Sequence, residues 1–306
     1  MTRALVTGGA GFIGHNLSQV LLDGGIEVSI LDDLSSASPL GPPAGAIFYE
    51  GSVVDPPPID GQFDVIYHLA SPASPPRYLA DPIGTLRTSA EGTRQMLDRA
   101  AADDAVFVLA STSEVYGDPL EHPQPESYFG NVDITSARAC YDEAKRYAEA
   151  LTYAYHRSGT VQATRVARIF NTYGPAMAPD DGRIVTNFLT QALDDLPLTL
   201  YGDGSQTRSF CYVSDLVDGL IRLADSSVAE PINLGNPIEM SVSDFADVVA
   251  NLVGDTGRIY KDLPVSDPVR RQPDISLARS ELGWEPMVPL VDGLQRTIEY
   301  LRDVRS

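Results

Sequence analysis

A glycine-rich turn between a short apolar segment and an amphipathic segment most constrains what this chain can fold into. The apolar run that begins at Ala4 leads into Gly8, Gly11 and Gly14, and the residues that follow have the spacing of a helix. Glycines at this spacing let the backbone approach a diphosphate, whose charge the N-terminus of the next helix stabilises. The pattern predicts a strand, a turn and a helix that begin a dinucleotide-binding sheet.

An acidic residue follows at the distance that such a sheet requires. A second apolar run, Glu27–Leu31, ends at Asp32, roughly 20 residues after the glycines. A carboxylate at this place accepts hydrogen bonds from ribose hydroxyls and repels the additional phosphate of NADP. Because no arginine follows within the next three residues, the sequence favours NAD over NADP.

Tyr141 and Lys145 are four residues apart on a predicted helix, so they share one helix face. A tyrosine that accepts a proton near neutral pH needs its pKa of about 10 lowered, and a nearby cation favours the phenolate. Taken alone, this spacing is more often that of a surface pair. Together with the glycine turn it predicts a general base, with Lys145 expected to lower the pKa of Tyr141.

Strand and helix signals alternate along the first half of the chain. This alternation predicts an α/β fold, with a Rossmann-type doubly wound parallel sheet and a smaller C-terminal α/β substrate domain. Ligands of such sheets bind beyond the carboxyl ends of the strands. The predicted strands are Arg3–Thr7, Glu27–Leu31, Ala46–Tyr49, Asp64–Leu69, Ala105–Ala110 and Gln162–Ile169.

The pattern becomes less regular after Asn171, which we take as the domain boundary. The predicted NAD-binding domain comprises residues 1–171, with returning segments near 210–237 and 272–283. The predicted substrate domain comprises residues 172–209, 238–271 and 284–306. Later predicted elements are a strand at Leu198–Tyr201 and helices at Val185–Leu196, Val213–Asp225 and Ser243–Val253, the last capped by Ser243.

Composition excludes several classes of partner. The 306 residues include 22 basic and 42 acidic side chains and carry a net charge of −20, which argues against nucleic acid and anionic membranes. Two cysteines and four histidines give neither a disulfide framework nor metal-ligand spacing, so no metal is expected. No leader or membrane-spanning apolar run is evident, and we expect a cytoplasmic protein.

Motifs along nearly the whole chain carry a family resemblance. The chain resembles the extended short-chain dehydrogenase/reductases that act on nucleotide sugars, and within them the UDP-glucuronic acid decarboxylases. The matching segments are His68–Pro76, Ser111–Gly117, Arg138–Glu143, Arg165–Thr172, Asp181–Arg183, Tyr201–Arg208, Tyr212–Asp215, Asn233–Pro237 and Pro273–Ile275.

The resemblance implies that NAD oxidises C4 of UDP-glucuronic acid, carbon dioxide leaves from the resulting 4-ketone, and hydride returns to give UDP-xylose. The implied catalytic residues are Thr112, Glu114, Tyr141, Lys145 and Arg271. The implied cofactor-binding residues are Gly8, Gly11, Phe12, Ile13, Gly14, Asp32, Asp33, Ser52, Val53, Leu69, Ala70, Ser71, Tyr141, Lys145 and Ile169. The implied substrate-binding residues are Ser71, Pro72, Ala73, Ser113, Glu114, Asn171, Arg183, Tyr201, Gln206, Arg208 and Arg271.

Other activities on the same fold stay open at this point. A 4,6-dehydratase would have an aspartate where Ser113 stands, and a 4-epimerase would explain neither Glu114 nor Arg271. A non-catalytic NAD-binding regulator is a remote alternative. Ser52, Gly84, Ser89 and Ala144 depart from the family pattern, and weaker cofactor binding at Ser52 would allow partial release of a UDP-4-keto-pentose.

The resemblance also implies a homodimer. Its interface would be a four-helix contact, with the helix that carries Tyr141 contributed by each subunit. Apolar and aromatic side chains on that helix are the expected contacts: Tyr147, Ala150, Leu151 and Tyr155.

Overall fold

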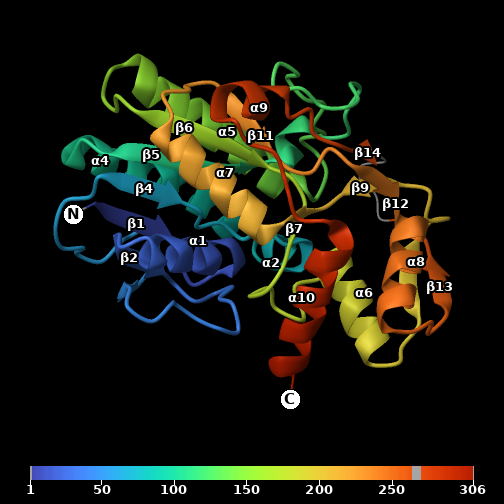
Figure 1. Cartoon of the computed structure of the whole chain (residues 1–306). Helices are drawn as coiled ribbons and strands as arrows, with labels where there is room; N and C mark the ends of the chain where they lie inside the picture. The colour runs from blue at the N-terminus through green and yellow to red at the C-terminus, as the bar shows by residue number, and fades with distance from the viewer. Residues whose placement is uncertain (1, 264–269, 306) are drawn as a thin grey trace.

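The computed structural model describes residues 2–263 and 270–305, and a seven-stranded parallel sheet forms its centre (Figure 1). The strand order is β11-β6-β5-β4-β1-β2-β3, the doubly wound arrangement that confirms the predicted Rossmann-type α/β class. The strands are β1 (Arg3–Thr7), β2 (Glu27–Asp32), β3 (Ile47–Glu50), β4 (Val65–His68), β5 (Val106–Thr112), β6 (Thr164–Ile169) and β11 (Pro231–Leu234).

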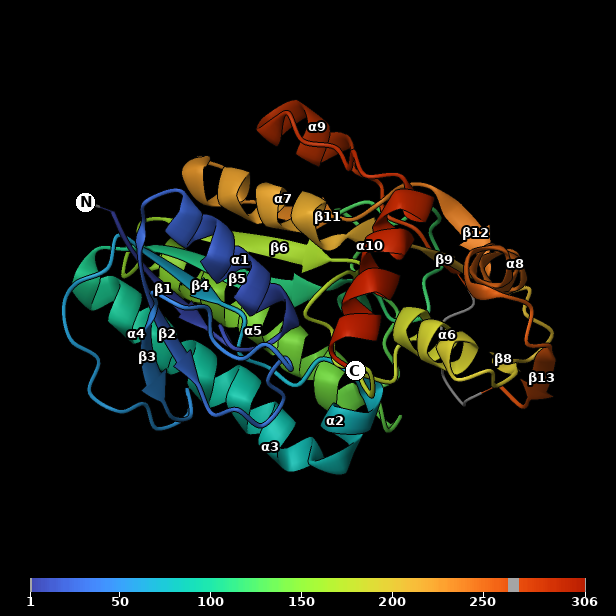
Figure 2. The ribbon, with the colours of Figure 1, turned by 60° about the horizontal axis from the view of Figure 1, so that its bottom comes forward.

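Helices cover both faces of the sheet. On one face α1 (Phe12–Asp23) packs beside α7 (Val213–Asp225), and on the other α4 (Thr93–Asp103) packs beside α5 (Ala139–Arg157) (Figure 2). Successive strand residues point to opposite faces, so Leu5 and Val6 belong to different core clusters and are both fully buried. Burial on both faces explains why the strands read as continuous apolar runs.

A smaller part of the molecule lies beyond the carboxyl ends of the strands (Figure 1). There β8 pairs with β13, and β9 lies between β12 and β14. The elements of this part are α6 (Ile184–Leu193), β8 (Leu198–Tyr201), β9 (Thr207–Ser209), β12 (Glu239–Ser241), α8 (Val242–Val253), β13 (Arg258–Lys261), β14 (Arg270–Arg271) and α10 (Leu290–Asp303).

The remaining elements are short. They are α2 (Pro75–Ala80), α3 (Pro82–Arg87), η1 (Thr88–Gly92), η2 (Ser113–Tyr116), β7 (Thr172–Tyr173), β10 (Cys211–Tyr212) and α9 (Ser276–Leu282). Residues 1, 264–269 and 306 of the predicted domains lie outside the described residues. Within the described part of the chain no helix is long and apolar enough to cross a membrane, and no three His, Cys, Asp or Glu residues cluster as metal ligands.

The predicted cap of α8 is wrong by two residues. Ser241, with extended backbone, accepts a hydrogen bond from the Asp244 N–H at 3.0 Å. Ser243 lies inside the first turn, where its own backbone is already helical. Two serines flank this helix start in the sequence, and the dihedral angles of the chain decide which of them caps the helix.

Candidate active site

A cavity of about 730 Å³ opens between the carboxyl edge of the sheet and the smaller part of the molecule. Every residue predicted to contact cofactor or substrate lines this cavity except Ser52. The Ser52 hydroxyl instead accepts a hydrogen bond from the Val54 N–H at 3.2 Å. Its neighbour Val53 does line the cavity.

The glycine turn forms one end of the cavity and fits a diphosphate. Gly8 follows β1 with a φ of +72°, a conformation that glycine adopts without strain. A Cβ atom on Gly14 would lie 2.1 Å from the Gly8 carbonyl oxygen, so a side chain there would push α1 away from the turn. Gly11 precedes α1 without a capping side chain, which leaves the first N–H groups of the helix for an anionic ligand.

Asp32 forms the wall beside this turn. Its Oδ2 accepts a hydrogen bond from the Ala10 N–H at 3.0 Å, and its Oδ1 accepts one from the Leu34 N–H at 2.8 Å. Burial raises the pKa of Asp32, while both N–H donors act in the opposite direction. Each carboxylate oxygen retains a lone pair, so ribose hydroxyls can still donate to it.

Tyr141 lies in the first turn of α5 and is 5% exposed. Its ring stacks on Tyr78 of α2, with ring centres 5.0 Å apart and an angle of 5° between the planes. Burial raises the pKa of Tyr141 above its ordinary value, and a hydrogen bond with Thr112 at the end of β5 lowers it in part.

The lysine of the pair contacts the sheet rather than the phenol oxygen. Lys145 Nζ donates a hydrogen bond to the Ala110 carbonyl oxygen at 2.8 Å and lies 5.9 Å from the centre of the Tyr141 ring. Burial lowers the pKa of Lys145 to about 8. In the chain alone, burial of the phenol outweighs the groups that lower the pKa of Tyr141, and the expected lowering by Lys145 stays a prediction.

Two guanidinium groups share one carboxylate oxygen of Glu114, which also lines the cavity. Glu114 Oε2 lies 2.6 Å from Arg138 Nη2 and 3.3 Å from Arg271 Nη2. Burial alone would raise the pKa of Glu114, but the charges of Arg271 and Arg138 hold it below its usual range. Glu114 is therefore an ionised carboxylate at neutral pH.

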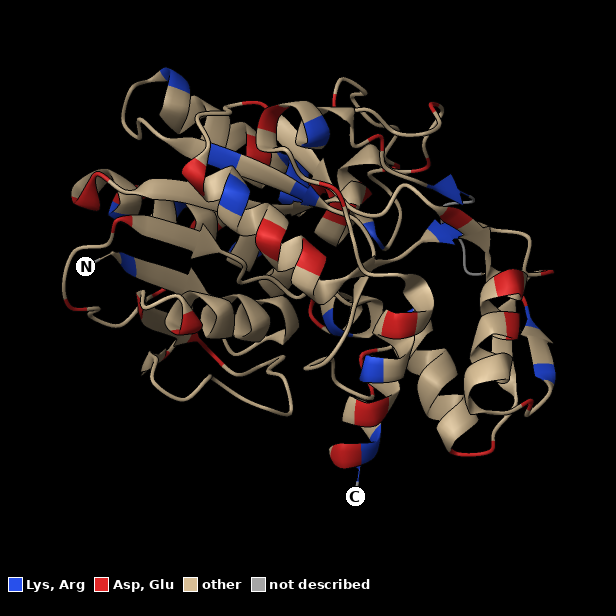
Figure 3. Ribbon diagram, in the orientation of Figure 1, with Lys and Arg blue, Asp and Glu red and all other residues tan. Residues whose placement is uncertain are grey.

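Arg271 is anchored to the turn that carries Glu114. It is 2% exposed and donates hydrogen bonds to the carbonyl oxygens of Ser113 and Gly117. On the parallel strands β14 and β9, Arg271 stands in register with Arg208, and Figure 3 shows basic residues on both strands. These arginines give one end of the cavity a positive character within an acidic chain, as an anionic ligand requires.

Other residues of the smaller part line the same cavity. Arg183 is paired with Asp181 at 2.5 Å, and its guanidinium lies 5.7 Å from the centre of the Phe12 ring. Gln206 donates a hydrogen bond to the Tyr201 carbonyl oxygen at 2.8 Å, which ties the end of β8 to the start of β9. The charge of Arg183 is thus partly neutralised within the chain.

Arg138 and Tyr78 also line the cavity, and neither is among the site residues predicted from the sequence. Arg138 stands three residues before Tyr141 on the chain, so helical spacing was an available signal. Tyr78 comes from a distant segment, and no local pattern indicates that it stacks on Tyr141. The arrangement as a whole can move a proton at Tyr141 and bind an anion beside Arg271.

Comparisons with known proteins agree with this geometry. Residues 4–235 match the NAD dependent epimerase/dehydratase family. UDP-glucuronic acid decarboxylase 1 from Xenopus tropicalis is 50% identical to this chain over an alignment of 310 residues. The alignment covers 98% of this chain and 72% of that relative.

Two solved structures have the same fold over their whole length. UDP-glucose 4-epimerase from Thermotoga maritima, with UDP-glucose, has a TM-score of 0.91 and 27% identity, and the match covers 100% of both chains. UDP-glucuronic acid 4-epimerase from Bacillus cereus, in complex with UDP-glucuronic acid and NAD, has a TM-score of 0.85 and 26% identity over 99% of this chain and 100% of that one.

The family match covers most of the chain, and the glycine turn, Asp32, Tyr141 and Lys145 meet in one cavity. The chain therefore belongs to the NAD dependent epimerase/dehydratase family.

Proposed function

We infer that this chain is a UDP-glucuronic acid decarboxylase that converts UDP-glucuronic acid to UDP-xylose with NAD. The observation that carries this function is the identity of 50% with a UDP-glucuronic acid decarboxylase over 98% of the chain. The Glu114 and Arg271 pair supports it, because an acidic sugar brings a carboxylate that a buried guanidinium recognises.

The glycine turn would hold the diphosphate of NAD, and Asp32 the adenosine ribose. Lys145 would bind the nicotinamide ribose, since its ammonium lines the same cavity. When bound, NAD accepts the C4 hydride and later returns it, so that the sugar undergoes no net oxidation. The chain has to supply the proton transfers and the charge stabilisation.

Tyr141 is the proposed base for the C4 hydroxyl. It takes the hydroxyl proton as the 4-ketone forms and gives it back when C4 is reduced. The Thr112 hydroxyl would bond the same oxygen, as its hydrogen bond with Tyr141 already brings the two groups together.

Glu114 and Arg271 act at C5 and C6, next to the oxidised C4. The 4-ketone lies β to the C6 carboxylate, so the C5–C6 bond can break with its electrons left in an enolate as carbon dioxide departs. A proton must then be added to C5, and we propose that the ionised Glu114 orients a water molecule that supplies this proton and leaves as hydroxide. Arg271 stabilises negative charge on the carboxylate or the enolate.

The uridine diphosphate would lie against the smaller part. We propose that Asn171, Arg183, Tyr201, Gln206 and Arg208 contact it, because these polar side chains line that end of the cavity. The two-domain division predicted from the sequence fits this arrangement and stays a proposal, as does a cytoplasmic location.

The first test is proton NMR of the purified protein with UDP-glucuronic acid and NAD. UDP-xylose as the main product is the expected result. UDP-galacturonic acid would instead identify a 4-epimerase, an activity found in the Bacillus cereus structure of similar fold. A UDP-4-keto-pentose beside UDP-xylose would show that the intermediate leaves the cavity.

The cofactor site predicts a loss of affinity when the acid at the end of β2 is changed. Asp32→Ser removes the ribose acceptor and the caps of the Ala10 and Leu34 N–H groups. We expect NAD to bind at least about tenfold more weakly by calorimetry, and the preference for NAD over NADP to shrink. Asp23→Asn, at the far end of α1, is the control and should leave both unchanged.

We propose a homodimer through α3 and α5. These two helices pack side by side, and Ile83, Leu86 and Tyr147 on them are 71%, 42% and 52% exposed. Of the contacts predicted from sequence, Tyr147 and Ala150 are exposed. Leu151 and Tyr155 pack partly against the core on that face of the sheet.

A charge on this surface should separate the subunits. Ile83→Glu would bury a carboxylate in the dimer, so we expect sedimentation velocity to show a monomer. Leu196→Glu changes a side chain that is 53% exposed after α6 and should leave the dimer intact. A monomeric wild-type protein would contradict the proposal.

A further inference from the structure

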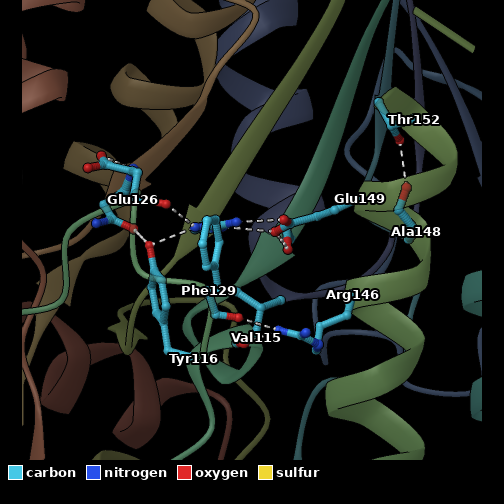
Figure 4. A network of polar contacts seen from close by, with 11 residues as sticks. Val115, Tyr116, Glu126, Phe129, Arg146, Ala148, Glu149 and Thr152 are labelled. Carbon is cyan, nitrogen blue, oxygen red and sulfur yellow. Dashed lines mark hydrogen bonds and ion pairs between the residues drawn. The ribbon is translucent and has the colours of Figure 1, made fainter. Parts of the chain in front are cut away.

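A buried polar network lies behind the cavity and begins on the helix that carries Tyr141 (Figure 4). Tyr141, Lys145 and Glu149 follow one another on α5 at intervals of four residues, on one face of the helix. The Glu149 carboxylate accepts a hydrogen bond from Ser111 Oγ at 2.5 Å. Arg168 of β6 donates two more to it, from Nε at 3.0 Å and from Nη2 at 2.8 Å.

Arg168 also contacts the turn that carries Glu114. Its Nη1 donates to the hydroxyl of Tyr116, the last residue of η2, at 3.0 Å, and to the Glu126 carbonyl oxygen at 2.9 Å. Tyr116 in turn donates to Asn233 Oδ1 at 2.7 Å. One guanidinium thus joins the helix with the proposed base to the turn with Glu114.

The same network reaches the strand that carries Arg271. Asn233 Nδ2 donates to the carbonyl oxygens of Gln124 and Asp274, each at 3.0 Å. The Gln272 N–H, next to Arg271, donates to Gln124 Oε1 at 2.9 Å. The helix with Tyr141, the turn with Glu114 and the strand with Arg271 are therefore connected through buried and partly buried hydrogen bonds.

Stability alone is a poor explanation for this ion pair. The side chains of Arg168 and Glu149 are 12% and 9% exposed, and apolar groups of similar size often replace such pairs without loss of stability. The fork of the guanidinium does fix direction as well as distance, which neither an apolar side chain nor a lysine can do.

We propose that Arg168 and Glu149 are positioning residues, which hold the helix carrying Tyr141 and Lys145 at a fixed spacing from the turn carrying Glu114. Neither lines the cavity, so both act through the residues that do. The inference rests on the proposed decarboxylase function, since that reaction needs Tyr141 on the helix and Glu114 on the turn in the same turnover.

Glu149 also faces the only buried lysine of the described chain. The groups around Lys145 are the Ala110 carbonyl of β5, His68 of β4, and Tyr141 and Glu149 of α5. Burial lowers the pKa of Lys145 to about 8, and Glu149 opposes that lowering. Burial and the Lys145 charge lower the pKa of His68 to about 3, so His68 is neutral and Glu149 supports the ammonium.

The kinetic test compares two arginines of β6. Arg168→Lys keeps the charge and loses the fork, so we expect kcat to fall at least about tenfold and KM for UDP-glucuronic acid to change less than about twofold. Arg165→Lys is the control: Arg165 is 7% exposed and donates to the Ser226 carbonyl oxygen at 2.9 Å, outside the network. An equal loss of kcat in both variants, or no loss in Arg168→Lys, would overturn the proposal.

A second readout needs neither cofactor nor substrate. The chain has two lysines, Lys145 and the exposed Lys261, so NMR of protein labelled at lysine reports the titration of Lys145. Glu149→Gln should lower that midpoint by about one pH unit, because an adjacent carboxylate favours the ammonium. An unchanged midpoint refutes the role of Glu149. A wild-type protein that releases no carbon dioxide refutes the decarboxylase function and leaves this titration as an independent test.

Discussion

Replacing Tyr141 with phenylalanine is expected to lower kcat for UDP-xylose formation by about 10³-fold. The variant lacks the hydroxyl that takes the C4 proton and that forms the hydrogen bond with Thr112. The ring can keep its stacking on Tyr78, so the fold and the cavity should persist. Product formation by NMR measures the loss of turnover, and binding of UDP by calorimetry measures whether the cavity persists.

A second tyrosine of α5 provides the matched control. The Tyr153 hydroxyl is buried and has no hydrogen-bond partner among the described residues. Tyr153→Phe therefore removes a hydroxyl without breaking a hydrogen bond. We expect an unchanged kcat and an unchanged or higher free energy of unfolding. If Tyr141→Phe turned over at the rate of Tyr153→Phe, Tyr141 would not be the base.

The fold was accessible from the sequence because its signals are local. The apolar runs of a parallel sheet are continuous. The amphipathic helix α7 and the strand β8 also have the predicted bounds. Boundaries were less certain where two residues of one type compete, as Ser241 and Ser243 do for the cap of α8. β5 extends to Thr112, two residues beyond the predicted end.

The composition of the site was accessible too, but its electrostatics was not. Almost every side chain predicted from the motifs lines the cavity wall. Ser52 does not, and its hydroxyl accepts a hydrogen bond from the Val54 N–H of its own loop. The raised pKa of Tyr141 and the lowered pKa of Glu114 depend on burial and on Arg138 and Arg271. These are contacts between segments far apart in the chain, which no local pattern contains.

Glu114→Gln is expected to stop the reaction after the C4 hydride has left the sugar. The amide has the size of the carboxylate and lacks the charge that Arg138 and Arg271 share at Oε2. Tyr141 and Thr112 are unchanged, so oxidation at C4 should proceed. We expect reduced cofactor to accumulate with the enzyme, while kcat for UDP-xylose falls about 10²-fold.

Binding should change in the opposite direction from turnover. Without the Glu114 charge, the buried Arg271 guanidinium attracts the carboxylate of the substrate more strongly, so KM for UDP-glucuronic acid should fall in Glu114→Gln. That tighter ground state would itself slow the loss of carbon dioxide, since stabilising the departing carboxylate raises the barrier. Glu143→Gln, an acid of α5 paired with Arg146 at 3.3 Å, is the control and should change neither constant. Full activity in Glu114→Gln, or a rise in KM, would show that the sugar carboxylate does not replace Glu114 as the partner of Arg271.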